Sequence, residues 1–155
     1  MTTESRTLIT TRNEFHDALR WAFEQAAQQG CRELWLVDGD FGDWPLAEKA
    51  VLEQLTAWAQ SHRRMTLIAQ SFDDFARRHP RWVEWRRQWS HVVHCRTNTE
   101  LESGRMPTIL LAPGLLMVRL SDAVHHRGIR STEPADLLQV RETIDAVLQR
   151  SEEAF

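Results

Sequence analysis

Tyrosine is absent from this sequence of 155 residues, lysine occurs once, as Lys49, and there are two cysteines. Cys31 and Cys95 do not form a Cys-x-x-Cys motif, and so sparse a use of cysteine is typical of reduced thiols in a cytosolic protein. No stretch approaches the roughly 18 apolar residues of a membrane-spanning helix, and the first ten residues lack the apolar segment of a secretory signal. We therefore expect a cytoplasmic protein that does not engage a membrane.

The length and charge of the chain favour one soluble domain. A chain of about 150 residues can bury roughly 68–70% of its unfolded surface, so it needs no disulfide or metal to fold. The net charge of −3 is too small to indicate nucleic acid or membrane as a partner. No repeat or linker divides the sequence. We expect a single domain over residues 1–155, with a core from about residue 7 to about residue 150 and loose tails at 1–6 and 151–155.

Hydrophobic periodicity predicts alternating strands and helices. Helix 12–29 has Thr11 as N-cap, Glu14 completing a capping box, and Gly30 as its end. A second helix is expected from about Asp43 and Pro45 to about residue 61. The other expected elements are an edge strand 7–10, buried strands 33–38 and 65–69, strand 91–96, a hairpin of 108–112 and 115–120, an edge strand 123–130, and helix 134–150. This order predicts an α/β fold with a mixed, largely parallel sheet flanked by helices on both faces.

Residues 71–96 hold three of the seven tryptophans and six of the arginines. Ser71 is a good N-cap for a first helix, and Pro80 ends that helix and opens a second. The spacing of Trp82, Trp85 and Trp89 puts these three rings on one face of the second helix, which is typical of a stripe facing the core.

The same stretch has more arginines than carboxylates in a protein that is acidic overall. Guanidinium groups could bind phosphates or a partner's carboxylates in a bidentate way. The same guanidinium groups could instead form a solvated face or pair with glutamates of neighbouring helices. The residues of this candidate binding surface are Arg77, Arg78, His79, Arg81, Arg86 and Arg87.

An acidic loop follows the first buried strand. Asp38-x-Asp40 resembles the opening motif of haloacid-dehalogenase-type phosphatases, in which the first aspartate accepts phosphate, the second is a general acid, and Mg²⁺ binds nearby. A turn in which Asp and Gly suit the backbone explains the same residues.

His91, His94 and Cys95 invite a metal interpretation, but a strand places His94 on the face opposite the other two. No set of residues reaches three convergent ligands with zinc-type spacing, so we expect neither a metal nor a cofactor.

Four segments carry a resemblance to a known family: TRNEFHDALRWAFEQA, ELWLVDGDFGDWPL, the His79-Pro80-Arg81-Trp82 stretch leading into a His/Val strand, and EPADLLQVRETIDAVLQRSEE. Over about residues 11–153 the chain resembles one half of the phospholipase D superfamily. More closely it resembles uncharacterised proteobacterial domains that sometimes follow an acetyltransferase domain. In the superfamily two such halves pack together, so the resemblance implies a homodimer.

Catalytic members of that superfamily carry a His-x-Lys-x4-Asp motif, whose histidine is the nucleophile and whose lysine binds phosphate. On this chain the three positions are Met106, Thr108 and Pro113, none of which can perform these roles. The segment from His125 to Thr132 keeps the spacing but only the histidine, on a different strand. The resemblance therefore implies a non-catalytic domain.

Two functions follow as hypotheses. The first is a dimeric binding or scaffold module that engages a protein or a nucleic-acid backbone through the arginine surface. The second is a Mg²⁺-dependent phosphohydrolase that uses Asp38 and Asp40.

Overall fold

The computed structural model describes residues 5–60, 62–102 and 104–155. Predictions for residues 1–4 of the N-terminal tail, for Ser61 and for Ser103 lie outside this range. The helices are α1 (Arg12–Gln29), α2 (Lys49–Trp58), α3 (Phe75–Arg78), α4 (Pro80–Gln88) and α5 (Pro134–Gln149). The strands are β1 (Arg6–Ile9), β2 (Glu33–Asp38), β3 (Arg64–Ala69), β4 (Val93–Thr97), β5 (Thr108–Ala112), β6 (Leu116–Asp122), β7 (Arg127–Ser131) and β8 (Glu152–Glu153).

The strands form one sheet in the order β1-β7-β6-β5-β2-β3-β4-β8. The pairs β2–β3 and β3–β4 are parallel, and the other five pairs are antiparallel. The predicted α/β class with a mixed sheet is confirmed, although parallel pairs are the minority. Parallel neighbours need long crossover connections, and among strands that are adjacent in the sheet, helical crossovers join β2 to β3 and β3 to β4.

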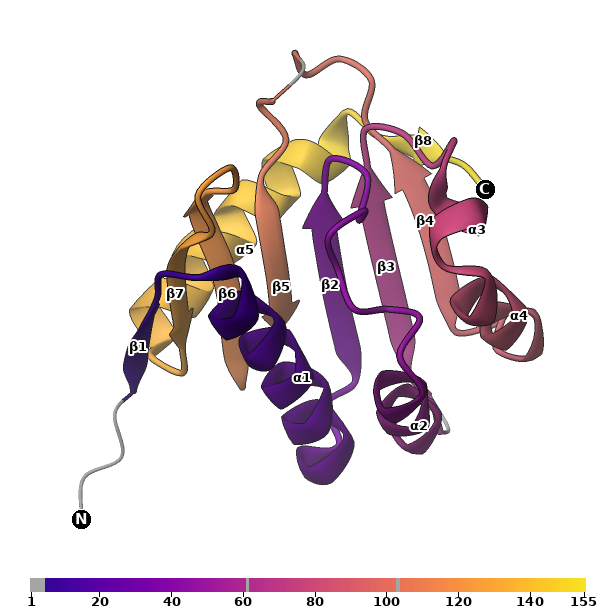
Figure 1. Cartoon of the computed structure of the whole chain (residues 1–155), viewed down its shortest axis with the longest axis horizontal. Helices are drawn as coiled ribbons and strands as arrows, with labels where there is room; N and C mark the ends of the chain where they lie inside the picture. Colours follow the sequence, from indigo (N-terminus) through magenta and orange to yellow (C-terminus); the bar gives the residue numbers. More distant parts are fainter. Residues whose placement is uncertain (1–4, 61, 103) are drawn as a thin grey trace.

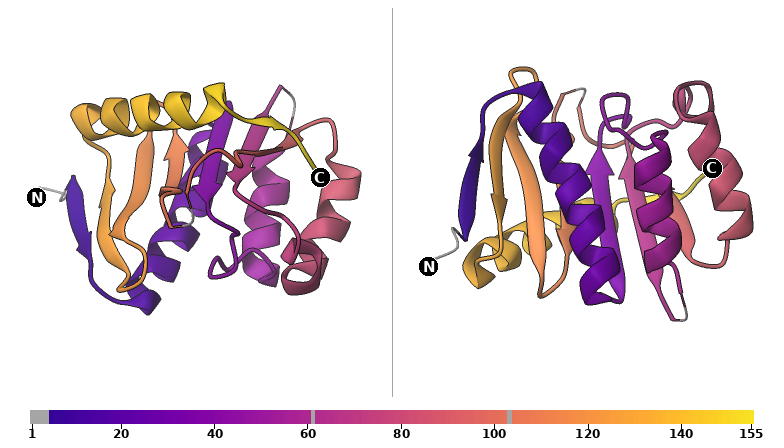
Figure 2. Two further views of the ribbon diagram at one scale, coloured as in Figure 1. Left: turned by 90° about the horizontal axis from the view of Figure 1, so that it is seen from above. Right: turned by 60° about the horizontal axis from the view of Figure 1, so that its bottom comes forward.

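Helices cover both faces of the sheet (Figures 1 and 2). Helices α1 and α2 lie on one face, with α3 and α4 beside them near β4, while α5 crosses the other face. Two separate hydrophobic clusters correspond to these two layers. In the part of the chain that the structure describes, no helix has the length and apolar character needed to cross a membrane.

Helix α1 begins and ends as its sequence predicts. The Thr11 hydroxyl accepts a hydrogen bond from the Glu14 amide at 3.1 Å, and Gly30 ends the helix in the left-handed conformation at φ 73°. Helix α2 begins later than predicted, at Lys49. The reason is that the Asp43 carboxylate is held by Arg12 and His126 and is not available to cap a helix.

Two strand predictions need correction. Strand β7 was expected at an edge, but it lies between β6 and β1, and β1 is the edge strand. The C-terminal tail was expected to be loose, but Glu152 and Glu153 pair with β4, and the Ala154 amide donates to the Cys95 carbonyl at 3.0 Å. This polar segment has no hydrophobic period, so the sequence carried no strand signal for it.

The tryptophan periodicity of the 71–96 stretch is confirmed. Trp82 is fully buried and Trp85 is 8% exposed, while Trp89 packs at the margin of the same cluster. The first helix is shorter than predicted and spans only Phe75–Arg78. A chain of ring contacts joins α3 and α4 to the loop after β2, including Phe41–Phe75 at 6.0 Å and Phe75–Trp82 at 5.0 Å between centroids.

Candidate functional site

The candidate site lies at one end of two central, antiparallel strands, where β2 ends and β5 begins (Figure 1). Strand β2 has the parallel strand β3 on one side and the antiparallel strand β5 on the other. Open α/β sheets commonly place ligands beside the carboxyl ends of their strands, and the carboxyl end of β2 lies here. Here the side chains of Asp38, the last residue of β2, and Thr108, the first residue of β5, meet.

The Asp38 carboxyl group is occupied by donors from its own chain. Its Oδ1 accepts a hydrogen bond from the Thr108 hydroxyl at 2.6 Å. Its Oδ2 accepts bonds from the backbone amides of Phe41 at 2.8 Å and Asp40 at 3.4 Å. Burial raises the pKa of Asp38, and it outweighs these hydrogen bonds, which act to lower it. The group therefore ties the end of β2 to the start of β5.

The three positions of the superfamily's catalytic motif do not gather at one point. Thr108 is 4% exposed and is hydrogen-bonded to Asp38, and Met106 is 8% exposed within the hydrophobic cluster under α5. Pro113 follows the last residue of β5, so it lies at the opposite end of that strand. At this end of the strands, Met106 stands where the motif would have its histidine nucleophile. Thr108, whose hydroxyl is hydrogen-bonded to Asp38, stands where the motif would have its lysine.

Asp40 serves the acidic loop itself. Its Oδ1 accepts a hydrogen bond from the Gly42 amide at 2.8 Å, and its Oδ2 lies 3.7 Å from the Arg78 guanidinium. The Arg78 side chain packs directly against Gly42, where a Cβ would lie 1.6 Å from an Arg78 nitrogen and would displace that side chain. Within the described ranges, no three histidine, cysteine or acidic side chains come together as a metal site.

The predicted binding arginines lie on α3 and α4, and we call them the α3–α4 arginine surface: Arg77, Arg78, Arg81, Arg86 and Arg87. Arg77 pairs with Asp74 at 3.2 Å and Arg87 with Glu84 at 3.1 Å. Arg86 donates to the Phe155 carbonyl and lies 4.8 Å from that ring. Among the described residues Arg81 has no ionic partner. On α4 the helical spacing directs Arg81, Arg86 and Arg87 to different sides of the buried tryptophan face.

His79, the sixth residue of the predicted surface, lies beneath it. The ring is 4% exposed, and its Nε2 donates a hydrogen bond to the Phe41 carbonyl at 2.8 Å. Burial lowers the pKa of His79, so the neutral ring is favoured. The structure thus gives His79 a role in joining the acidic loop to α3 and α4, and it does not place the ring where a surface ligand could reach it.

A polar cluster that the sequence did not predict joins α1, the acidic loop and the β6–β7 turn. Arg12 donates to Asp43 Oδ1 at 2.6 Å, His126 binds Asp43 Oδ2, and His16 donates to the Asp43 carbonyl at 2.6 Å. Burial acts to raise the pKa of Asp43, but the bonds from His126 and Arg12 lower it overall. No local pattern could have revealed this cluster, because His126 lies 83 residues beyond Asp43.

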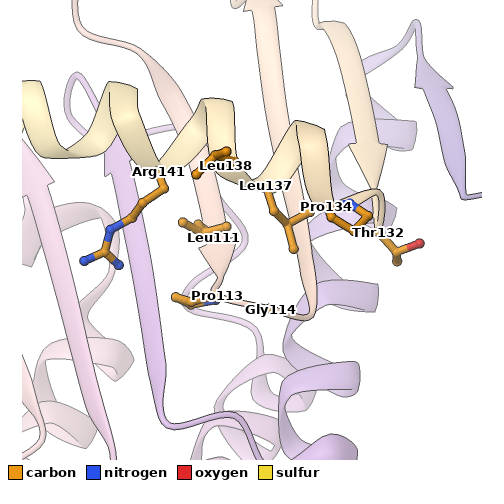
Figure 3. Close-up of a pocket in the computed structure, with 8 residues that line it drawn as sticks. All are labelled: Leu111, Pro113, Gly114, Thr132, Pro134, Leu137, Leu138 and Arg141. Carbon is orange, nitrogen blue, oxygen red and sulfur yellow. The ribbon is translucent and has the colours of Figure 1, made fainter.

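A shallow groove of about 340 Å³ lies between α5 and the β5–β6 turn (Figure 3). The apolar side chains of Leu111, Pro113, Leu137 and Leu138 are among those that line it. Arg141 lies at one end of the groove. Its guanidinium nitrogens are 3.2 Å from the Asp145 carboxylate and 3.8 Å from the Glu33 carboxylate, so its charge is already paired within the chain. The groove is apolar in character.

Comparison with known proteins identifies the fold. A scan against protein-family models finds no match, and a search of curated proteins finds none either. Among solved structures, the archaeal chromatin protein TrmBL2, which shows a novel mode of DNA binding, matches with a TM-score of 0.69 and 9% identity over 99% of this chain and 55% of its own. This chain therefore spans about half the length of that one.

Nuc from Salmonella typhimurium, a phospholipase D family member, matches with a TM-score of 0.58 and 7% identity over 87% of this chain and 90% of its own. At such low identity the likeness concerns the fold alone. The chain has a phospholipase D-like α/β fold.

Proposed function

We propose that this chain is a non-catalytic phospholipase D-like domain that acts as a binding module, and that its ligand is a nucleic-acid backbone. The observation that carries the first part is the Thr108–Asp38 hydrogen bond at the position of the phosphate-binding lysine. A threonine hydroxyl engaged by a buried carboxyl supplies no charge to a phosphate, and Met106 supplies no nucleophile.

The likeness to TrmBL2, which binds DNA, supports nucleic acid as the ligand. The α3–α4 arginine surface is the proposed contact, with Arg81, Arg86 and Arg87 projecting around α4. Arginine residues that neutralise phosphates release counterions, so the binding would weaken steeply with salt. The superfamily pattern of paired halves makes a homodimer the proposed form, which would double the number of phosphate contacts.

The experiment is a titration of intrinsic tryptophan fluorescence with a single-stranded oligonucleotide at low and high salt. Trp82, Trp85 and Trp89 belong to α4 and its C-cap, the same segment as Arg81, Arg86 and Arg87, so their fluorescence would report binding there. Replacing Arg81, Arg86 and Arg87 with glutamine should abolish a salt-sensitive response. Replacing Arg32, Arg64 and Arg105 with glutamine removes the same charge elsewhere and should leave the response intact.

Hydrolysis of bis(p-nitrophenyl) phosphate and of p-nitrophenyl phosphate, with and without Mg²⁺, tests the absence of catalysis. No turnover is expected. Turnover of the monoester that requires Mg²⁺ and disappears in Asp38→Asn would instead establish the phosphohydrolase hypothesis. Absence of any oligonucleotide response at low salt would exclude nucleic acid, and a protein partner would then be sought for the same surface.

A further inference from the structure

A groove of about 370 Å³ lies between α2 and α4, which cover the same face of the sheet (Figures 1 and 2). Its α2 wall consists of residues three and four apart, which share one face of that helix: Lys49, Leu52, Glu53 and Thr56. Helix α4 contributes Arg81. The indole N–H of Trp85 donates to the Thr56 hydroxyl at 2.9 Å and joins the two helices beside the groove. The groove is therefore formed by two packed helices and not by a loop.

Two exposed cations in this groove are free to bind a ligand. Lys49 is the single lysine of the sequence, and in the part of the chain that the structure describes neither it nor Arg81 forms an ion pair. Glu53 supplies the one carboxylate of the lining, so the groove carries a net positive charge. The Thr56 hydroxyl is already occupied, because it donates to the Leu52 carbonyl at 2.9 Å and accepts from the indole of α4. The chemistry of the groove therefore favours an anion held by Lys49 and Arg81.

The other arginines of the α3–α4 arginine surface are engaged within the chain. Three of them form ion pairs with carboxylates, at 3.2, 3.7 and 3.1 Å: Arg77, Arg78 and Arg87. Arg86 follows Arg81 by five residues, which places it about 140° further around the helix axis, on the opposite side of the tryptophan face. There its guanidinium donates to the Phe155 carbonyl and lies against that ring. A ligand of α4 therefore meets free positive charge on the side of Arg81, next to α2.

We propose that the groove between α2 and α4 holds the nucleic-acid backbone, and that Lys49 and Arg81 are the two cations that contact its phosphates. This inference rests on the proposed function and gives it a place: it adds Lys49 to the contact and assigns Arg86 to the docking of the C-terminal segment. Ammonium and guanidinium groups both bind phosphate, the first as a point charge and the second as a fork. None of the residues that line the groove is aromatic, so the contact is with phosphates and carries little preference for base sequence.

Lys49 allows a direct measurement, because no other side chain of the sequence carries a primary amine. The intact chain is treated with an N-hydroxysuccinimide ester that acetylates amines, and mass spectrometry of the Lys49 peptide measures the rate of reaction. A single-stranded oligonucleotide at low salt should slow this reaction severalfold, and high salt should restore the rate. At the same oligonucleotide concentration, Arg81→Gln should lose most of this protection.

Fluorescence anisotropy of a labelled oligonucleotide tests each charge of the groove. Lys49→Gln and Arg81→Gln should each weaken binding and lower the slope of log K against log salt by about 0.7, the value for one phosphate contact on a single strand. Glu53→Gln removes the carboxylate of the groove and should strengthen binding. Arg86→Gln should change the slope little. Arg127→Gln is the matched control, because it removes an exposed charge on β7, at the other end of the sheet (Figure 1).

Failure of this inference and failure of the proposed function give different results. Oligonucleotide binding with an unchanged salt slope in Lys49→Gln and Arg81→Gln would keep a nucleic-acid-binding module but overturn the groove as its site. Weaker binding by Glu53→Gln, or a reaction rate of Lys49 that bound oligonucleotide does not alter, would overturn it as well. Absence of binding by the intact chain at low salt would overturn both. Thermal unfolding of each variant shows whether a loss reflects binding or folding, and these exposed substitutions should leave it unchanged.

Discussion

Replacing Asp38 with asparagine keeps the size of a buried side chain but removes its ability to ionise. Burial raises the pKa of Asp38 above its ordinary value of about 4. The folded protein therefore binds this proton more tightly than the unfolded chain does. Asp38 contributes stability that is fully present below about pH 4 and is lost as the pH rises through the raised pKa. The excess stability of the wild type over Asp38→Asn should thus be largest in acid and shrink toward neutral pH.

The hydrogen bonds of Asp38 set the size of the effect. Thr108 donates to one carboxyl oxygen at 2.6 Å and the Phe41 amide donates to the other at 2.8 Å. Asparagine has one acceptor oxygen, which can keep the Phe41 amide, while the Thr108 hydroxyl must turn to accept from the new amide N–H group, an exchange that should cost about 0.5–1.5 kcal/mol. Asp38→Ala deprives both donors and should cost about twice as much.

Urea unfolding followed by tryptophan fluorescence, from about pH 5 to about pH 8, measures both effects. Groups that titrate in both proteins, such as Asp43, cancel in the difference. Asp40→Asn is the matched control, because it makes the same substitution at an exposed carboxylate of the same loop, which accepts a hydrogen bond from the Gly42 amide and lies 3.7 Å from Arg78. A wild-type advantage over Asp38→Asn that is constant or grows with pH would refute the reasoning, since it would mean that the donors, and not burial, dominate the ionisation of Asp38.

Three further changes test the packing of the fold. Trp82→Ala should cost about 3–5 kcal/mol of unfolding free energy because the ring is fully buried, with Trp82→Phe costing less; a loss below about 1 kcal/mol would contradict the core assignment. Gly128→Ala should destabilise the protein by about 1–3 kcal/mol, since the new Cβ would lie 1.9 Å from a β6 carbonyl oxygen. Gly39→Ala, where a Cβ meets open space, is the control and should change the unfolding free energy by no more than about 0.5 kcal/mol. Equal stability of the two variants would contradict the close approach at Gly128. Burial raises the pKa of Cys95 to about 11, so a thiol reagent at about pH 8 should modify Cys31 first and Cys95 only as the protein unfolds, and rapid modification of native Cys95 would argue against its burial.

Local chemistry predicted much of this fold from the sequence. The N-cap at Thr11, the left-handed end at Gly30 and the opening of α4 at Pro80 depend on residues within one helical turn, and the structure confirms all three. The burial of Trp82 and Trp85 follows from a period of 3.6 residues, which needs only the helix to exist. The α/β class follows from the order of these elements.

Contacts between distant segments decided the rest. The Asp38–Thr108 bond joins residues 70 apart and depends on β5 lying antiparallel to β2, which no local pattern specifies. The raised pKa of Asp38 and the lowered pKa of His79 arise from burial, a property of the folded chain as a whole. The arginines of α3 and α4 were identifiable by composition, but their intrachain partners were not. Strand order likewise decided that Leu8, Ile129 and Arg119 lie side by side on one face of the sheet, because side chains on three strands become neighbours only once those strands pair.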